Sequence, residues 1–169
     1  MAMNLIVGQS GGPTAVINSS LAGVYETAKN LGVNKVYGML YGIEGLLQEK
    51  MVDLDDMLGD IMSIELLKRT PSSYLGSCRC KLPTPEQDES VYDTLFRLFD
   101  KYEIGALLYI GGNDSMDTIA KLSAYGARIR SKVRFIGVPK TIDNDLMLTD
   151  HTPGYGSAAK YIATILKEV

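Results

Sequence analysis

The sequence predicts an α/β fold of the Rossmann-like, doubly wound kind, with a mainly parallel sheet and helices on both faces. Two observations predict it. Short continuous apolar runs, typical of strands buried in a parallel sheet, alternate along the chain with segments of helical periodicity. Glycine-rich or acidic loops follow three of these runs, as expected where a strand passes the chain to a helix. The length of 169 residues and the 46% hydrophobic content suit one ordinary globular domain.

Each element of this fold has its own signal in the chain. Apolar, β-rich runs predict buried strands at 3–7, 35–40, 106–110 and 133–137. Helical spacing of apolar residues predicts helices at 15–29, 85–102 and 116–124, and a last helix that ends at Glu168. Segment 42–45 is expected to be a turn. From 46 to 67 only short helical pieces are expected, around Asp55 and Ile61.

Charge and composition exclude several classes of function. A net charge of −3 gives no reason to expect a nucleic-acid partner. No apolar run approaches the roughly 18 residues of a membrane span, and no signal peptide is visible, so we expect a cytoplasmic protein without a membrane partner. Cys78 and Cys80 are expected to be reduced thiols, because two thiolates alone make a poor metal site. His151 is the only histidine, and no acyl-transfer triad can be assembled around it.

Two loops contain groups that suit an anion. Gly11 and Gly12 lie between a strand and a helix, where backbone amides can face a phosphate, although a tight turn is the simpler interpretation. Their spacing matches neither the dinucleotide-binding fingerprint nor the P-loop. Arg79 follows a serine- and glycine-rich loop, and its planar fork suits oxyanions, although it can equally be a solvated surface residue.

The stretch 138–145 has the highest density of reactive groups. Lys140, Thr141, Asp143 and Asp145 directly follow a predicted strand, and ligands bind at the carboxyl ends of parallel strands. Aspartates in such a loop can also simply cap the next helix. Together with the glycine loops and the arginine, this set suits phosphoryl transfer, in which positioning and charge neutralisation supply most of the catalysis.

Five motifs in this order and spacing resemble the 6-phosphofructokinases over nearly the whole chain. They are Gly11-Gly12, Leu75-Gly76-Ser77-Cys78-Arg79, Ile110-Gly111-Gly112-Asn113-Asp114-Ser115, Pro139-Lys140-Thr141-Ile142-Asp143-Asn144-Asp145 and Gly154-Tyr155-Gly156-Ser157-Ala158. Lipid and NAD kinases share a similar glycine loop, but they lack the Thr-Ile-Asp-Asn-Asp block.

The resemblance implies phosphoryl transfer to the 1-hydroxyl of fructose 6-phosphate, with Mg²⁺ as cofactor. In the family's pattern Asp143 is the general base, Asp145 is the second catalytic acid and Thr141 contacts the sugar, so these three also bind the substrate. Other positions match the side of the site that binds the phosphoryl donor. These are Gly11, Gly12, Arg79, Gly111, Gly112, Asp114 and Ser115.

Two of these residues bear on the donor. The ATP-dependent enzymes usually have glycine where this chain has Asp114 and Lys140, so the chain resembles the pyrophosphate-dependent branch. The physics agrees, because Asp114 would lie near the α-phosphate of ATP, and like charges about 4 Å apart repel by roughly 4 kcal/mol at an effective dielectric constant near 20. Lys140 could neutralise charge that develops on pyrophosphate, which makes it a third catalytic candidate. An ATP-dependent 6-phosphofructokinase is the alternative.

Two departures from the family pattern qualify this interpretation. Asn113 stands where the family usually has an aspartate near Mg²⁺, and an amide oxygen ligates more weakly than a carboxylate. Family members are also about twice as long or longer, so residues 1–169 are expected to be an N-terminal donor-binding domain without the C-terminal sugar-phosphate domain. An isolated piece of this kind could act only as a phosphate- or nucleotide-binding module. A homo-oligomer is expected for the full-length protein.

Overall fold

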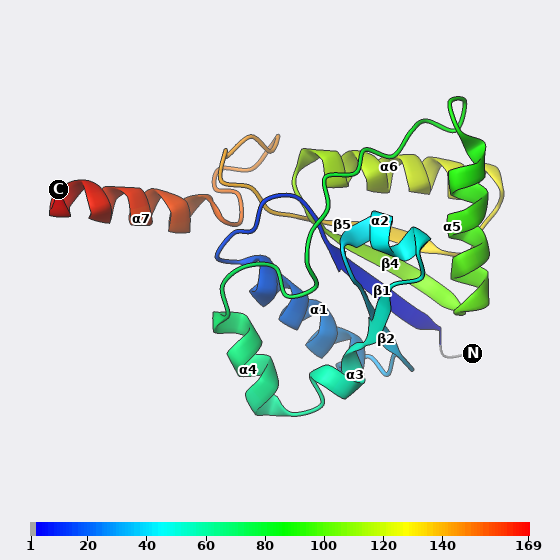
Figure 1. The fold of residues 1–169 in the computed structure, drawn as a ribbon, viewed down its shortest axis with the longest axis horizontal. Coiled ribbons are helices and arrows are strands. Elements are labelled where there is room, and N and C mark those ends of the chain that lie inside the picture. Colours follow the sequence, from blue (N-terminus) through cyan, green and yellow to red (C-terminus); the bar gives the residue numbers. More distant parts are fainter. Residues whose placement is uncertain (1–2) are drawn as a thin grey trace.

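The computed structural model describes residues 3–169 and has one five-stranded sheet in the order β3-β2-β1-β4-β5 (Figure 1). All neighbouring strands are parallel except β2 and β3, which are antiparallel. The strands are β1 (Asn4–Gln9), β2 (Val36–Met39), β3 (Met51–Asp53), β4 (Ile104–Gly111) and β5 (Arg134–Pro139). The helices are α1 (Ile17–Asn30), α2 (Gly42–Leu47), α3 (Leu54–Met57), α4 (Ile61–Arg69), α5 (Glu89–Lys101), α6 (Asn113–Arg128) and α7 (Tyr155–Glu168).

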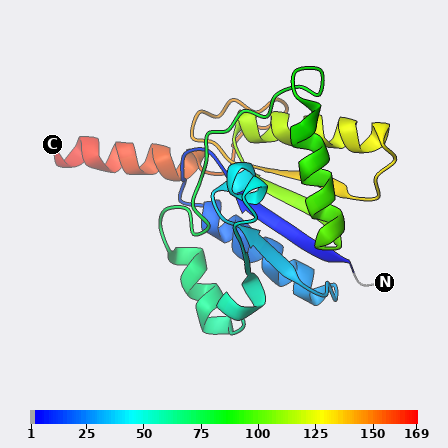
Figure 2. The same cartoon turned by 45° about the vertical axis from the view of Figure 1, so that its right-hand side comes forward.

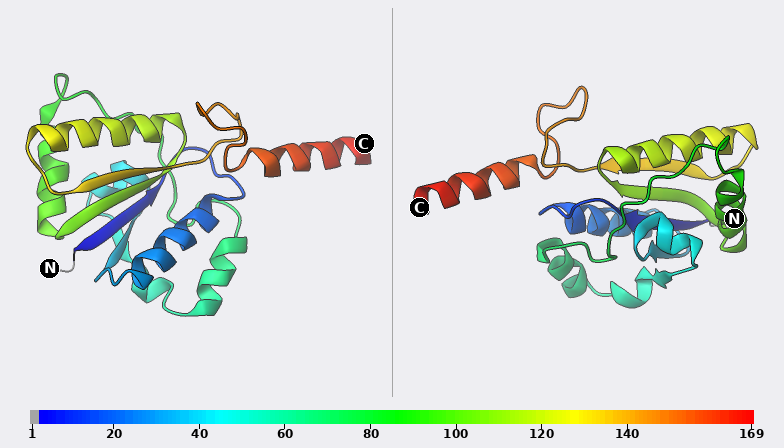
Figure 3. Two further views of the ribbon diagram at one scale, coloured as in Figure 1. Left: turned by 180° about the vertical axis from the view of Figure 1, so that it is seen from behind. Right: turned by 45° about the horizontal axis from the view of Figure 1, so that its top comes forward.

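Helices cover both faces of the sheet, as the sequence predicts. One core joins α2, α5 and α6 to the sheet, and its centre includes the fully buried Tyr92, Phe99 and Tyr109. The second core joins α1, α3 and α4 to the opposite face around Leu21 and Leu54. The turned views show these two helical layers on either side of the strands (Figures 2 and 3). The fold class is therefore the predicted α/β, doubly wound one.

Several details differ from the sequence prediction. Segment 42–45, expected to be a turn, begins helix α2, and the short antiparallel strand β3 was not expected at all. Strand β5 was predicted to be buried, but it forms the edge of the sheet, and Ile136 is 46% exposed. An apolar run of five residues cannot distinguish a central strand from an edge strand whose outer face is open.

Helix α7 extends away from the sheet, and none of its residues is buried (Figures 1 and 3). Its apolar side chains, Tyr161, Ile162, Ile165 and Leu166, are all exposed. Across residues 3–169, no helix combines the length and the apolar character that a bilayer span requires.

The topology brings three loops to one edge of the sheet. Strands β1, β4 and β5 are parallel neighbours, and their carboxyl ends align, with Gln9 opposite Ile110 and Gly111 opposite Pro139. Helix α1 after β1 covers one face, whereas α6 after β4 covers the other. This reversal opens a crevice between β1 and β4, which is where open α/β sheets bind their ligands.

Candidate active site

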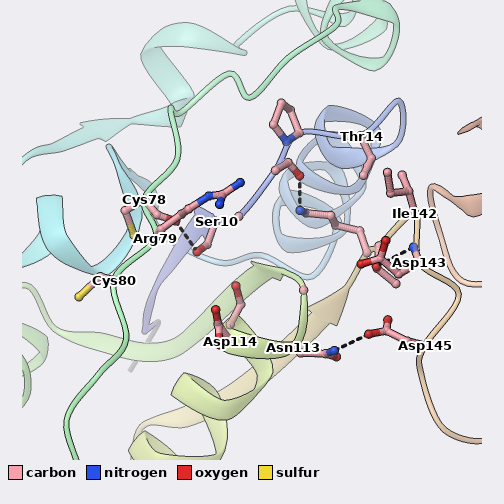
Figure 4. Close-up of a pocket in the computed structure, with 17 residues that line it drawn as sticks. Ser10, Thr14, Cys78, Arg79, Cys80, Asn113, Asp114, Ile142, Asp143 and Asp145 are labelled. Carbon is pink, nitrogen blue, oxygen red and sulfur yellow. Dashed lines mark hydrogen bonds between the residues drawn. The ribbon is translucent and has the colours of Figure 1, made fainter.

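The crevice holds a cleft of about 550 Å³ at the carboxyl ends of β1, β4 and β5 (Figure 4). It is lined by Ser10, Gly11, Gly12, Pro13, Thr14, Cys78, Arg79, Cys80, Gly112, Asn113, Asp114, Ser115, Lys140, Thr141, Ile142, Asp143 and Asp145. The four segments that the sequence marked as reactive, near 11, 79, 113 and 143, therefore meet in one place. Of the predicted site residues, only Gly111 is absent from the lining.

The loop after β1 forms one wall of the cleft and is tied to the segment that contains Arg79. Gly11 has a φ of +73°, a conformation that glycine adopts without strain. Its N–H donates to the carbonyl of Cys78 at 3.2 Å, and its carbonyl accepts from Ser77 Oγ at 2.5 Å. These two hydrogen bonds hold the glycine turn and residues 77–79 together.

The second wall is the start of helix α6. Gly112 is the N-terminal cap, and its carbonyl accepts from the backbone N–H groups of Ser115 and Met116. Asn113 and Asp114 follow Gly112 directly, so backbone donors of the first helical turn lie at the cleft, where a helix favours an anion. Gly111 does not line the cleft, and a Cβ there would collide with the Ser115 side chain. Its role is thus to let helix and strand approach each other.

Lys140 is a buried cation at the floor of the cleft. It is only 3% exposed, and its Nζ donates to the carbonyl of Gly12. None of the ion pairs among residues 3–169 includes it. Burial lowers the pKa of Lys140, because the charged form has lost water without gaining a carboxylate. A buried ammonium without a counter-ion is well suited to receive an anionic ligand.

The loop that follows Lys140 presents two carboxylates at the other end of the cleft. Thr141 Oγ1 accepts from the N–H of Asp143 at 3.0 Å, which leaves its hydroxyl hydrogen free to donate. Asn144, with a positive φ of 54°, bridges the loop by donating to Asp150 O and accepting from Thr152 N. Asp145 Oδ2 accepts from Asn113 Nδ2 at 2.6 Å. The turn at Asn144 separates Asp143 from Asp145, and both side chains are exposed in the cleft.

Arg79 reaches into the cleft from the side opposite the acidic loop (Figure 4). Its side chain is exposed, and no hydrogen bond or ion pair within residues 3–169 occupies its guanidinium. The backbone before it is fixed by the buried Cys78, whose sulfur lies 3.5 Å from Tyr109 Oη. Both cysteines are free thiols, as the sequence predicts.

The sequence did not predict the side-chain contacts of the cleft, such as the Asn113–Asp145 hydrogen bond and an ion pair of Asp114. Lys81 Nζ lies 3.4 Å from a carboxylate oxygen of Asp114, and both side chains are largely exposed, by 77% and 66%. The two residues are far apart in the chain, and nothing in the local pattern around Lys81 indicates a partner. Thr14 was also missed: it lines the cleft, and its Oγ1 is buried without a hydrogen-bond partner.

Comparison with known proteins identifies the family of the chain. The family model described as Phosphofructokinase matches residues 4–169. The chain belongs to the phosphofructokinase family. A protein of Methylococcus capsulatus named pyrophosphate–fructose 6-phosphate 1-phosphotransferase is 41% identical over 169 residues, which are 99% of this chain and 40% of the relative.

A solved structure shares the fold at similar identity. The pyrophosphate-dependent phosphofructokinase of Nitrosospira multiformis superposes with a TM-score of 0.89 at 41% identity, covering 97% of this chain and 40% of its own. A more distant relative from Clostridioides difficile, named an ATP-dependent 6-phosphofructokinase, is 32% identical over 95% of this chain. The chain thus spans about 40% of the length of these two relatives, from Methylococcus capsulatus and Nitrosospira multiformis.

Proposed function

We propose that the protein transfers a phosphoryl group from pyrophosphate to the 1-hydroxyl of fructose 6-phosphate, giving fructose 1,6-bisphosphate. We further propose that residues 1–169 form its donor-binding domain, and that a separate domain holds the sugar phosphate. The observation that supports the donor assignment best is the presence of Asp114 and the buried Lys140 in one cleft with Asp143.

The donor side of the cleft suits a small, highly charged anion. Lys140 and Arg79 supply two cationic groups without carboxylate partners, and the glycine turn and the first turn of α6 supply backbone N–H groups. Lys140 stabilises negative charge best at the moment it develops, because the surrounding protein keeps water away from its ammonium group. In this proposal Lys140 therefore stabilises the transition state, while Arg79 and the glycines bind and orient the donor.

The acidic loop suits the acceptor hydroxyl. In this proposal Asp143 takes the proton of the attacking 1-hydroxyl as the new phosphorus–oxygen bond forms. A weakly basic carboxylate is adequate, since proton transfer is needed only as the transition state is reached. Thr141 has a free hydroxyl hydrogen to donate to the sugar. Asp145 borders the acceptor position and helps to bind the sugar.

The residues of the cleft fit a Mg²⁺ ion that arrives with the donor. No cluster of three or more His, Cys, Asp or Glu suited to a metal occurs within residues 3–169. Mg²⁺ is usually held by one or two carboxylates together with substrate phosphates, and Asp143 and Asp145 offer that number. Bound there, the ion would neutralise charge on the transferred phosphoryl group.

Two alternatives have different expected behaviour. An ATP-dependent enzyme would have to place the α-phosphate beside Asp114, and the repulsion argues against it. A binding module without catalysis would bind pyrophosphate and leave Asp143 without a role. The further expectations, a homo-oligomer in the cytoplasm that acts in glycolysis, remain predictions.

The test is a donor assay on the full-length gene product that contains this chain. We expect fructose 1,6-bisphosphate to form with pyrophosphate and Mg²⁺, and much less of it with ATP. Asp143→Ser should reduce turnover by about two to four orders of magnitude, the usual contribution of a general base, while calorimetry shows nearly unchanged pyrophosphate affinity. Turnover with ATP but none with pyrophosphate would refute pyrophosphate as the donor. Near-normal turnover of Asp143→Ser would refute Asp143 as the general base.

A further inference from the structure

The hydrogen bond between Asn113 and Asp145 joins two elements that are otherwise separate near the cleft. Asn113 is the first residue of α6, and Asp145 lies in the acidic loop, 32 positions later. Among residues 3–169, this is the only hydrogen bond that ties residues 142–151 to a part of the protein outside 141–154. All other bonds of this segment, including those of Asn144, close within the loop itself.

The orientation of the Asn113 amide follows from its partner. A carboxylate can only accept, so the NH₂ group must face Asp145 Oδ2 across the 2.6 Å contact. Turning the amide to offer its oxygen to a cation would set two acceptors against each other at that distance. A neutral donor also adds no negative charge to a cleft that already contains the carboxylates of Asp114, Asp143 and Asp145.

We propose that Asn113 is a positioning residue that holds Asp145 and the acidic loop in place, and that it is not a ligand of the magnesium ion. The anchored loop holds Asp143 in the cleft that also contains Lys140 before any substrate arrives. Carboxylates of the acidic loop, together with the donor, would hold Mg²⁺, and Asn113 would act only through Asp145.

A first experiment uses Mg²⁺ alone and does not depend on the proposed reaction. Calorimetry without donor should give Asn113→Ala a magnesium affinity within about twofold of the parent, because no ligand is lost. Asn113→Asp should bind Mg²⁺ at least about tenfold more tightly, since the new carboxylate faces Asp145 and affinity rises with ligand charge. If Asn113→Ala loses magnesium affinity tenfold, Asn113 is a ligand and the proposal is wrong.

Hydrogen exchange measures the anchoring itself. Loss of the only external hydrogen bond should speed amide exchange in segment 142–151 of Asn113→Ala by about tenfold, the lower end for a bond to a charged group. Asn30→Ala is the matched control, because Asn30 is also an exposed helical asparagine and its side chain makes no hydrogen bond within residues 3–169. Equal exchange in both variants would overturn the proposal.

The kinetic test rests on the proposed function and uses the full-length gene product. Asn113→Ala should lower kcat about tenfold with little change in the KM for pyrophosphate. In an Asp145→Ala background the same substitution should have almost no further effect, because its partner has already been removed. Effects that multiply independently would show that Asn113 does not act through Asp145. A parent enzyme inactive with pyrophosphate refutes the proposed function only, because the magnesium and exchange results still decide the role of Asn113.

Discussion

Removing the charge of Asp114 should open the donor site to ATP. Like charges 4 Å apart repel by about 1 kcal/mol in water and about 4 kcal/mol at an effective dielectric constant of 20. The Asp114 side chain is 66% exposed, and Lys81 lies 3.4 Å away, so solvent and a counter-charge both weaken the repulsion. The lower part of the range, about 1–2 kcal/mol, is therefore appropriate, which corresponds to roughly 5- to 30-fold in ATP affinity.

The assay compares kcat/KM for ATP and for pyrophosphate in the full-length gene product. Asp114→Asn keeps the shape and removes the charge, so it should raise kcat/KM for ATP by about 5- to 30-fold. Asp114→Gly removes the bulk as well, and any further gain measures the steric contribution. Lys81→Met is the matched control and should have the opposite effect. It removes the counter-charge of Asp114, so the repulsion of ATP should increase and kcat/KM for ATP should fall.

Each outcome separates charge from shape. If Asp114→Asn leaves ATP use unchanged and only Asp114→Gly improves it, selectivity depends on the volume of the side chain. If neither variant uses ATP better than the parent, Asp114 does not control the donor, and the electrostatic reasoning is refuted. High salt should reduce the effect of Asp114→Asn, because exposed charges are screened.

Three further predictions concern Lys140, Arg79 and the fold. Burial lowers the pKa of Lys140 in the free protein, and a bound anion should raise it again. Near that lowered pKa, pyrophosphate binding should therefore be coupled to proton uptake, and the affinity should fall as pH rises through it. Calorimetry in buffers of different ionisation enthalpy should show this proton uptake, and Lys140→Met should lose it. Arg79→Lys should weaken pyrophosphate binding about tenfold in the same calorimetric assay, because the paired donors of the guanidinium are lost. Gly45→Ala should lower the free energy of unfolding in urea by more than about 2 kcal/mol, because the new Cβ would collide with the Leu40 carbonyl. Gly23→Ala in helix α1 has free space around the new Cβ and should raise the free energy of unfolding by about 0.5–1 kcal/mol.

The sequence predicts the fold class well because the signals are local. Four strands coincide with apolar runs, and each begins and ends within about two residues of its predicted range, so these strands can be predicted from the hydrophobic pattern alone. Strand β3 has only three residues, all half-buried, so it shows no hydrophobic pattern of its own. It forms only because it pairs with β2, and that pairing cannot be predicted from three residues. Helix α2 is similarly short, and its two glycines resemble turn residues.

All the residues that the sequence singles out as site candidates, except Gly111, line the cleft, but the contacts between their side chains were not predicted. Gly11, Gly112 and Asp143 meet because the parallel strands β1, β4 and β5 bring the loops that follow them to one edge, a rule that operates without coordinates. Arg79 lies instead between α4 and α5, and its segment is tied to the cleft by the hydrogen bonds between Gly11 and residues 77–78. The Lys81–Asp114 and Asn113–Asp145 pairs depend on side-chain reach across separate loops, which no spacing rule supplies. The burial of Lys140 also could not be predicted from the sequence, because a lysine that follows a strand is normally solvated.

The two residues on which the donor proposal rests occupy rigid positions. Asp114 lies in the first turn of α6, and Lys140 directly follows the last residue of β5 and is packed under the Gly12 carbonyl. Asp143 and Asp145, in contrast, lie on a loop that one hydrogen bond ties to the helix. A charge on a rigid element keeps its distance from the donor in every conformation of the loop, so its effect on donor choice is not averaged away. It follows that substitutions at 114 should change the donor with little effect on the acceptor. Substitutions at 140 should also lower turnover, because Lys140 stabilises the transition state in the proposed reaction, and substitutions in the loop should lower turnover with either donor.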